Sequence, residues 1–196
     1  MSRTLTTLAT VSLAVLVPTA AVAAATPTPA PKLATTLSTA VTSSTCSVTW
    51  GSLPKGSSRS SSAVLTGVRS GQHACYDRLV IDLRGPIVGY DVRYVDTVRA
   101  DGSGTPIPLR GGARLAVVVL VPAYDSAGQP TYRPVNVKEL TNVTGYRTFR
   151  QVAWAGSFEG RTTVGLGVRA RLPFRVFTLA GPGDGSRLVI DVAHTW

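Results

Sequence analysis

The sequence is poor in the residue types on which catalysis and metal binding most often depend. The 196-residue chain has two cysteines and two histidines, and aromatic residues make up only 7% of it. A zinc site usually needs three or four nitrogen or sulfur ligands, which two histidines and scattered carboxylates do not supply. No Gly-x-Ser-x-Gly sequence is present, so the nucleophile elbow of the α/β-hydrolases is excluded. We therefore expect no metal, no cofactor and no enzymatic activity.

The sequence also lacks a run of the roughly 20 apolar residues that a transmembrane helix needs. Its longest apolar stretch, residues 5–17, is diluted by Thr and Ser, follows Arg3 and precedes the small-residue sequence 21–23. This is the pattern of a secretory signal peptide, which we assign to 1–25, with an uncleaved membrane anchor as the alternative. Residues 26–45 are mostly Thr, Pro, Ala and Ser and predict a flexible linker. We expect a secreted, extracytoplasmic protein with no transmembrane segment after signal cleavage.

The two cysteines are expected to form a disulfide, because an even number in a secreted chain favours pairing. A Cys46–Cys75 bridge would close a loop of about 30 residues and stabilise the fold by roughly 3–4 kcal/mol on the chain-entropy estimate. The alternative is a catalytic thiol, for which His73 is the nearest candidate base.

Acidic residues are few relative to basic ones, and the net charge is +10. Loss of Arg3 with the signal peptide leaves 19 basic and 10 acidic residues, a net charge of +9. Such a protein is attracted to anionic surfaces, although the charge also serves solubility. Seventeen of the 20 basic residues are Arg, which favours bidentate recognition of carboxylate or phosphate. The charge alone fits wall polymers, lipid headgroups and extracellular nucleic acid. Of these we expect an anionic cell-wall polymer and not nucleic acid as the partner, and the candidate ligand-binding residues are Arg78, Arg93, Arg169, Arg171, Arg175 and Arg187.

One five-residue sequence, Arg-Leu-Val-Ile-Asp, occurs twice, at 78–82 and at 187–191. In each copy apolar residues alternate with the charged ones, which is the pattern of a strand with one face in a core. The copies are either two ordinary half-buried strands or the first and last strands of one β domain. If they are neighbours in a sheet, Asp82 and Asp191 are expected to lie close together beside the two flanking arginines. That arrangement favours a salt-bridged sheet face over a pair of glycosidase carboxylates.

The rest of the folded part alternates in the same way, with turn residues every 8–12 positions. We expect a central strand buried on both faces at 115–121, a bulged strand at 146–155, and a short helix or edge strand at 135–140. These patterns predict an all-β fold: a single β-sandwich or partly closed barrel-like domain of about eight strands, over residues 46–196. The expected strands are 63–68, 79–83, 88–94, 115–121, 146–155, 164–168, 174–179 and 188–192.

Two short motifs have weaker chemical meaning. Residues 101–104, Asp-Gly-Ser-Gly, resemble part of a calcium loop but lack the downstream Glu, so they predict a turn. The triplet that begins at Asn142 matches the glycosylation sequon, which matters only in a host that uses it.

The stretch 73–85, followed by 89–95, resembles the opening of the AMIN-like domain of actinobacterial secreted proteins and lipoproteins. Further blocks of that pattern follow in order, and the resemblance spans roughly residues 64–193. The ordered set is specific, although no single block is. The later blocks are 101–108, the apolar run from Leu115, 156–160, 173–179 and 186–192.

The resemblance implies a β-sandwich module of the cell envelope. AMIN domains are attached to N-acetylmuramoyl-L-alanine amidases and to secretin components, where they target the protein to peptidoglycan without being catalytic. For this chain the resemblance implies a secreted, non-catalytic module that binds peptidoglycan or anionic wall polymers. The chain departs from many relatives in having no amidase domain and no lipobox Cys, so we expect it to be released or held non-covalently.

Two alternatives of other classes remain at this stage. One is an extracellular protein-interaction module that uses a sheet edge or an exposed apolar patch near Tyr90 and Tyr94. The other is a hydrolase whose site is assembled in space around His73 and His194, as a Ser-His-Asp triad would be.

Overall fold

The structure is a computed structural model that describes residues 46–86 and 89–196. The predicted signal peptide (1–25) and linker (26–45) lie outside the described residues, as does Val88 of the expected strand 88–94. These assignments, and the domain boundary at Cys46, therefore stay predictions.

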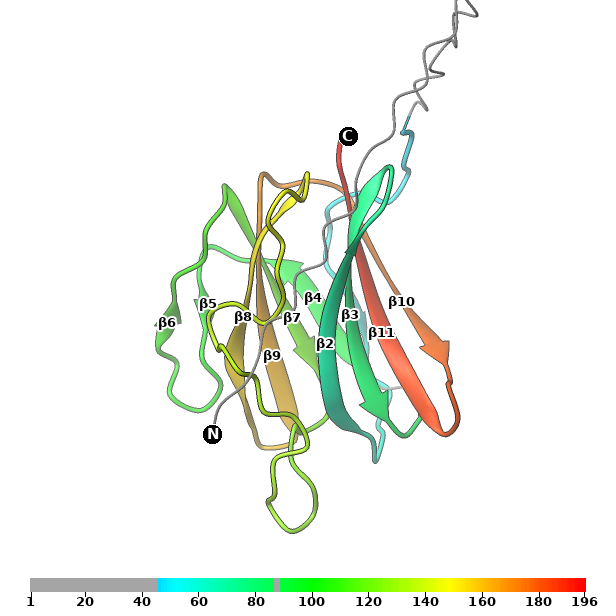
Figure 1. The fold of residues 1–196 in the computed structure, drawn as a ribbon, viewed down its shortest axis with the longest axis vertical. Helices are drawn as coiled ribbons and strands as arrows, with labels where there is room; N and C mark the ends of the chain where they lie inside the picture. The colour runs from blue at the N-terminus through cyan, green and yellow to red at the C-terminus, as the bar shows by residue number, and fades with distance from the viewer. Residues whose placement is uncertain (1–45, 87–88) are drawn as a thin grey trace, which may run out of the picture. The chain divides into compact units, whose positions relative to one another are not determined.

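The described residues form an all-β sandwich without helices (Figure 1). A five-stranded sheet in the order β1-β4-β7-β9-β8 packs against a four-stranded sheet in the order β10-β11-β3-β2, and β5 and β6 form a separate ribbon. The predicted fold class is confirmed, in its sandwich form. The strands are β1 (Lys55–Ser57), β2 (Val64–Gln72), β3 (Tyr76–Arg84), β4 (Tyr90–Tyr94), β5 (Val98–Arg99), β6 (Pro106–Ile107), β7 (Ala113–Val119), β8 (Phe149–Phe158), β9 (Arg161–Val168), β10 (Phe174–Ala180) and β11 (Gly185–Ala193).

The main core lies between the two large sheets and follows from the period-2 alternation of their strands. On β3, Leu79 and Ile81 point inward, and on β11, Leu188 and Ile190 do the same. Burial of each such side chain contributes about 1.5–3 kcal/mol. The strand that contains Tyr90 and Tyr94 also turns its apolar face inward, as predicted, because both rings pack partly against this core.

A second, smaller core lies on the outer face of the five-stranded sheet. There Val98 of β5 and Leu109 cover Ala116 of β7, so β7 is buried on both faces as predicted. The covering segment approaches β9 so closely that a Cβ on Gly167 would lie 2.0 Å from the carbonyl oxygen of Arg110. Glycine is therefore required at position 167 for steric reasons.

The segment between β7 and β8 differs in part from the prediction. The bulge expected in 146–155 is confirmed, since β8 shifts register twice against β9. The helix or edge strand expected at 135–140 is wrong: the segment is irregular and makes only isolated backbone bonds along β8, such as that from Trp154 N to the carbonyl oxygen of Val137 (2.7 Å). Val135 and Val137 are exposed and only Leu140 packs partly against the main core, so no continuous apolar face favours regular structure there.

The predicted disulfide is confirmed. Cys46 and Cys75 are joined, with their Cα atoms 5.3 Å apart. The described part of the chain has no free cysteine, which removes the catalytic-thiol alternative there. The bridge attaches the N-terminal segment to the beginning of β3, next to the end of β11, where His194 N donates to the carbonyl oxygen of Cys75.

Candidate ligand-binding face

The two Arg-Leu-Val-Ile-Asp copies pair directly with each other as β3 and β11, at the centre of the four-stranded sheet. The strands are antiparallel, and their register places Arg78 opposite Asp191 and Arg187 opposite Asp82. The expectation that Asp82 and Asp191 come close together is therefore wrong. Antiparallel pairing places the carboxylate of each copy opposite the arginine of the other copy. The two aspartates therefore lie at opposite ends of the paired five-residue stretch. The charged residues of both copies lie on the outer face of the sheet.

Asp191 is completely buried beneath this outer face and is held by two arginines. Arg78 donates from Nε to Oδ1 (2.6 Å) and from Nη2 to Oδ2 (2.9 Å), and Arg175 of β10 donates from Nε to Oδ2 (2.8 Å). The hydrogen bond to Asp191 raises the pKa of Arg78. One buried carboxylate thus fixes two guanidinium groups side by side and leaves a net positive charge at the surface.

Aromatic rings surround the two guanidinium groups. That of Arg175 lies 4.5 Å from the ring centroid of Trp50 and 5.1 Å from that of Phe177, and that of Arg78 lies 5.1 Å from that of Tyr76. Trp50 and Tyr76 also meet edge to face, with centroids 5.7 Å apart. Each such cation–π contact is worth about 0.5–1 kcal/mol at a partly exposed site. We call these six residues the Arg–aromatic cluster: Trp50, Tyr76, Arg78, Arg175, Phe177 and Asp191.

A shallow cavity of about 230 Å³ lies beside this cluster on the same face, and we call it the Arg187 cavity. Arg69 and Arg187 line it together with Arg78 of the cluster. Arg69 forms a bidentate ion pair with Asp82, at 2.7 and 3.0 Å. The rest of the lining is part apolar, from Val80, Leu179 and Val189, and part polar, from Ser70, Gly71 and His73.

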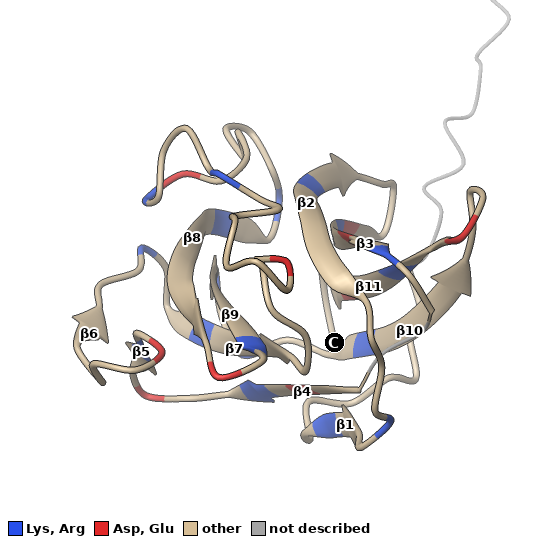
Figure 2. Ribbon diagram, turned by 90° about the horizontal axis from the view of Figure 1, so that it is seen from below, with Lys and Arg blue, Asp and Glu red and all other residues tan. Residues whose placement is uncertain are grey.

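The other predicted arginines do not join this face. Arg93 pairs with Asp91 on the five-stranded sheet (3.2 Å), Arg169 donates to the carbonyl oxygen of His194, and Arg171 donates to Ser52. Figure 2 shows the basic residues spread over both sheets and their loops. Of the six predicted arginines, three meet on the outer face of the four-stranded sheet: Arg78, Arg175 and Arg187.

Sequence reasoning missed the aromatic members of the cluster. Their signal was present, because Tyr76 precedes Arg78 by two positions and Phe177 follows Arg175 by two, which places each pair on one face of its strand. The sequence did not show that β10, β11 and β3 are neighbours, and Trp50 comes from a segment without regular structure.

The two histidines do not form a common site. His194 is buried, with Nε2 3.0 Å from Asp77 Oδ1 and Nδ1 3.2 Å from the carbonyl oxygen of Ala74. Both ring nitrogens thus face acceptors, and neither contacts a hydroxyl or thiol of the residues that the structure describes. His73 stacks instead on Tyr76, with ring centroids 4.6 Å apart. The geometry around the histidines therefore gives no support to the hydrolase alternative.

Asp77 links three segments of the fold. Besides facing His194 at the end of β11, its Oδ2 accepts hydrogen bonds from the backbone N–H groups of Thr148 (2.6 Å) and Phe149 (2.9 Å). The carboxylate thus joins the beginnings of β3 and β8 to the C-terminal segment, which accounts for the buried pair in structural terms.

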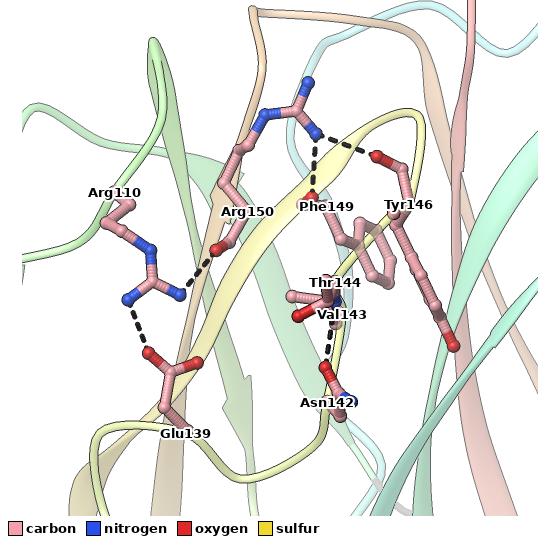
Figure 3. Close-up of a pocket in the computed structure, with 9 residues that line it drawn as sticks. Arg110, Glu139, Asn142, Val143, Thr144, Tyr146, Phe149 and Arg150 are labelled. Carbon is pink, nitrogen blue, oxygen red and sulfur yellow. Dashed lines mark hydrogen bonds and ion pairs between the residues drawn. The ribbon is translucent and has the colours of Figure 1, made fainter.

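A second pocket, of about 350 Å³, lies beside β8 (Figure 3). Its charged groups already have partners: Arg110 pairs with Glu139, and Arg150 donates to the carbonyl oxygens of Tyr146 and Phe149. The sequon residue Asn142 closes an Asx turn by accepting a hydrogen bond from Thr144 N (3.0 Å). These contacts hold the loop in place and leave no cation of this pocket without an acceptor.

Within residues 46–86 and 89–196, no three His, Cys, Asp or Glu side chains are placed to hold a metal ion. The same residues contain no helix with the length and apolarity to cross a membrane.

In class, the protein is an all-β sandwich module with an Arg–aromatic cluster on the outer face of its four-stranded sheet. The chain belongs to the AMIN-like domain family, whose family model matches residues 63–194. The resemblance seen in the sequence is thus confirmed over almost the same range. The family is envelope-associated, which makes this chain an envelope-associated module. A comparison with curated proteins gives no match.

Proposed function

We propose that this protein is a secreted, non-catalytic module that binds peptidoglycan or its anionic polymers through the Arg–aromatic cluster. One observation carries the proposal: Asp191 fixes Arg78 and Arg175 among three aromatic rings on an outer sheet face. Because these side chains are already ordered, little conformational entropy is lost when a ligand binds to them.

The composition of the face matches the chemistry of wall polymers. Aromatic rings offer apolar surfaces on which the C–H faces of sugars can stack, and guanidinium groups bind carboxylates and phosphates. The strand register places five arginines but only two aspartates on this face, so it attracts anions. The arginines are Arg69, Arg78, Arg84, Arg175 and Arg187, and the acids are Asp82 and Asp191.

The N-terminal region supports the same proposal. A signal peptide at 1–25 would export the protein, and the polar linker 26–45 would follow the cleavage site as a flexible spacer. Outside the membrane, the protein would be held at the wall non-covalently by charge and stacking.

The proposal is tested by retention of the protein, expressed from residue 26, on purified sacculi at low salt. We expect the wild type to be retained, and we expect Arg175→Gln to reduce retention several-fold. Arg93→Gln is the matched control, because it removes the same charge from an exposed position on the other sheet. Arg175→Gln leaves Asp191 paired with Arg78, so the fold should persist.

Two outcomes would overturn the proposal. No retention of the wild type at low salt would show that sacculi are not the ligand. Equal loss in Arg175→Gln and Arg93→Gln, with release at moderate salt, would show that net charge alone is responsible.

A protein-interaction role is the second candidate, and one feature favours it. β10 is an edge strand, and its register directs the backbone groups of Val176 and Thr178 away from β11, where no other described backbone group pairs with them. An extended peptide can add to such an edge. Tyr90 and Tyr94, which were expected to mark an apolar patch for this role, pack against the core instead. Retention on protein-free sacculi separates the two functions.

A further inference from the structure

We propose that the Arg187 cavity is a carboxylate pocket that takes the free C-terminus of a short peptide with small apolar side chains. The inference rests on the proposed function, because it names the part of the wall polymer that this sheet face recognises.

The first argument is a break in the symmetry of the strand pair. The register places Arg187 opposite Asp82 in the same way as it places Arg78 opposite Asp191. Arg78 binds its facing carboxylate, but both oxygens of Asp82 are taken by Arg69 of β2. Arg187 therefore carries the one guanidinium group lining this cavity that has no carboxylate partner among the described residues.

The second argument is the hydrogen bonding of Arg187 itself. Its Nη2 donates to the carbonyl oxygen of Ala180 at 3.2 Å, while its Nε is buried and meets no acceptor in the described part of the chain. A buried donor without a partner costs free energy, and native proteins leave few of them. An oxyanion in the cavity relieves this cost once the guanidinium group turns toward it, because Nε–H and an Nη–H then bind both oxygens side by side.

The third argument is the apolar part of the lining, which selects among oxyanions. Leu179 is 37% exposed and offers accessible apolar surface, while Val80 and Val189 on the central strands are 5% and 1% exposed. Ser70, Gly71 and His73 complete the lining beside the arginines. A volume of about 230 Å³ has room for roughly seven waters at ~30 Å³ each. That space fits a carboxylate and one or two methyl-bearing residues. A polyol phosphate chain has no apolar group to match these side chains, so the lining favours the peptide.

The test is calorimetric titration of the protein, expressed from residue 26, with N-acetyl-Ala-Ala in its L and D forms. We expect the dipeptide with a free carboxylate to bind at least tenfold more tightly than its C-terminal amide. Arg187→Met keeps the aliphatic stem and should abolish the difference. Arg84→Met is the matched control, because it removes the same charge from an exposed position on the same face. Arg187→Lys keeps the positive charge but lacks the paired N–H donors of a guanidinium group, so it should retain only part of the affinity.

Thermal unfolding of each variant distinguishes a role of Arg187 in ligand binding from a role in stabilising the fold. We expect Arg187→Met to be as stable as the wild type, because the loss of the hydrogen bond to Ala180 is offset by removal of a buried Nε–H that has no partner among the described residues. If that variant fails to fold, the comparison of acid with amide on the wild type and on Arg187→Lys still decides the question.

The inference is overturned if acid and amide bind equally, or if Arg84→Met loses as much affinity as Arg187→Met. It is also overturned if inorganic phosphate binds and the dipeptide does not, which would assign the cavity to a phosphate polymer. Retention on sacculi without dipeptide binding would refute this pocket and leave the proposed function standing. Dipeptide binding that depends on Arg187, without retention on sacculi, would refute the proposed function and leave the pocket.

Discussion

Arg78 and Asp191 face each other across β3 and β11, with Arg78 Nε 2.6 Å from Asp191 Oδ1, and each belongs to one copy of the same five-residue sequence. The second cross-strand pair, Arg187 and Asp82, is not joined in this way, because Arg69 binds Asp82 instead. The two copies of one sequence thus form different ion pairs, because different strands lie beside them.

The burial of Asp191 predicts that Asp191→Asn and Asp82→Asn differ greatly in their effect on the free energy of unfolding. Asp191→Asn should lower the free energy of unfolding by about 3–5 kcal/mol, because it leaves two guanidinium groups without their carboxylate. Asp82→Asn should cost less than about 1 kcal/mol, because the Arg69–Asp82 pair is partly exposed to solvent. Urea unfolding monitored by tryptophan fluorescence measures both, and equal losses would contradict the assignment of Asp191 as the buried anchor.

The Asp77–His194 pair is predicted to contribute to stability through its hydrogen bonds. Asp77→Asn should lower the free energy of unfolding by about 3 kcal/mol, because Asp77 accepts two backbone N–H groups and faces His194 in a fully buried position. Asp91→Asn, which alters only an exposed ion pair, is the control and should change stability by less than about 0.5 kcal/mol. An unchanged unfolding midpoint in Asp77→Asn would show that the network does not stabilise the sandwich.

The surroundings of Asp101 predict that its contribution to the free energy of unfolding falls as the pH rises, whereas that of an ion-paired carboxylate increases. Burial raises the pKa of Asp101 above its usual value of 3.8, although the hydrogen bond from Thr163 acts the other way. Its Oδ2 is buried without a partner among the described residues. Because the folded state favours the protonated form, the stabilisation from this group is complete below the unfolded pKa and is lost as the pH rises through the folded pKa.

Asp101→Asn removes this titration. We therefore expect the variant to gain stability relative to the wild type as the pH rises from about 3.5 to 7, by up to about 1 kcal/mol. Urea unfolding of both proteins across that range measures the difference. A relative gain by the wild type with rising pH would show that Asp101 is stabilised in its charged form.

Much of the sandwich could be read from local patterns, because alternation depends only on neighbouring residues and on the presence of one buried face. The turn at 101–104, the bulge in 146–155 and the doubly buried strand at 115–121 were all predicted on this basis. The segment 135–140 was not predicted correctly, because Val135 and Val137 remain exposed and only Leu140 packs partly against the core.

The candidate site was predicted only in part. Arg-rich composition suggested anion binding, but charge alone does not show which arginines meet. Arg78, Arg175 and Arg187 come together because β10, β11 and β3 are adjacent, while Arg93 lies on the other sheet. Strand neighbours are chosen by contacts between residues far apart in the chain, so no local pattern specifies them.

The amino-acid sequence by itself determined the all-β class, the disulfide, the excess of arginine and the family to which the chain belongs. These properties depend on local periodicity, on residue counts and on the order of blocks along the chain. Only the tertiary structure decided what the two Arg-Leu-Val-Ile-Asp copies do. Their antiparallel register, and the strands on either side, bury Asp191 between two arginines and leave Arg187 without a carboxylate among the described residues, since an ion pair depends on distances in space.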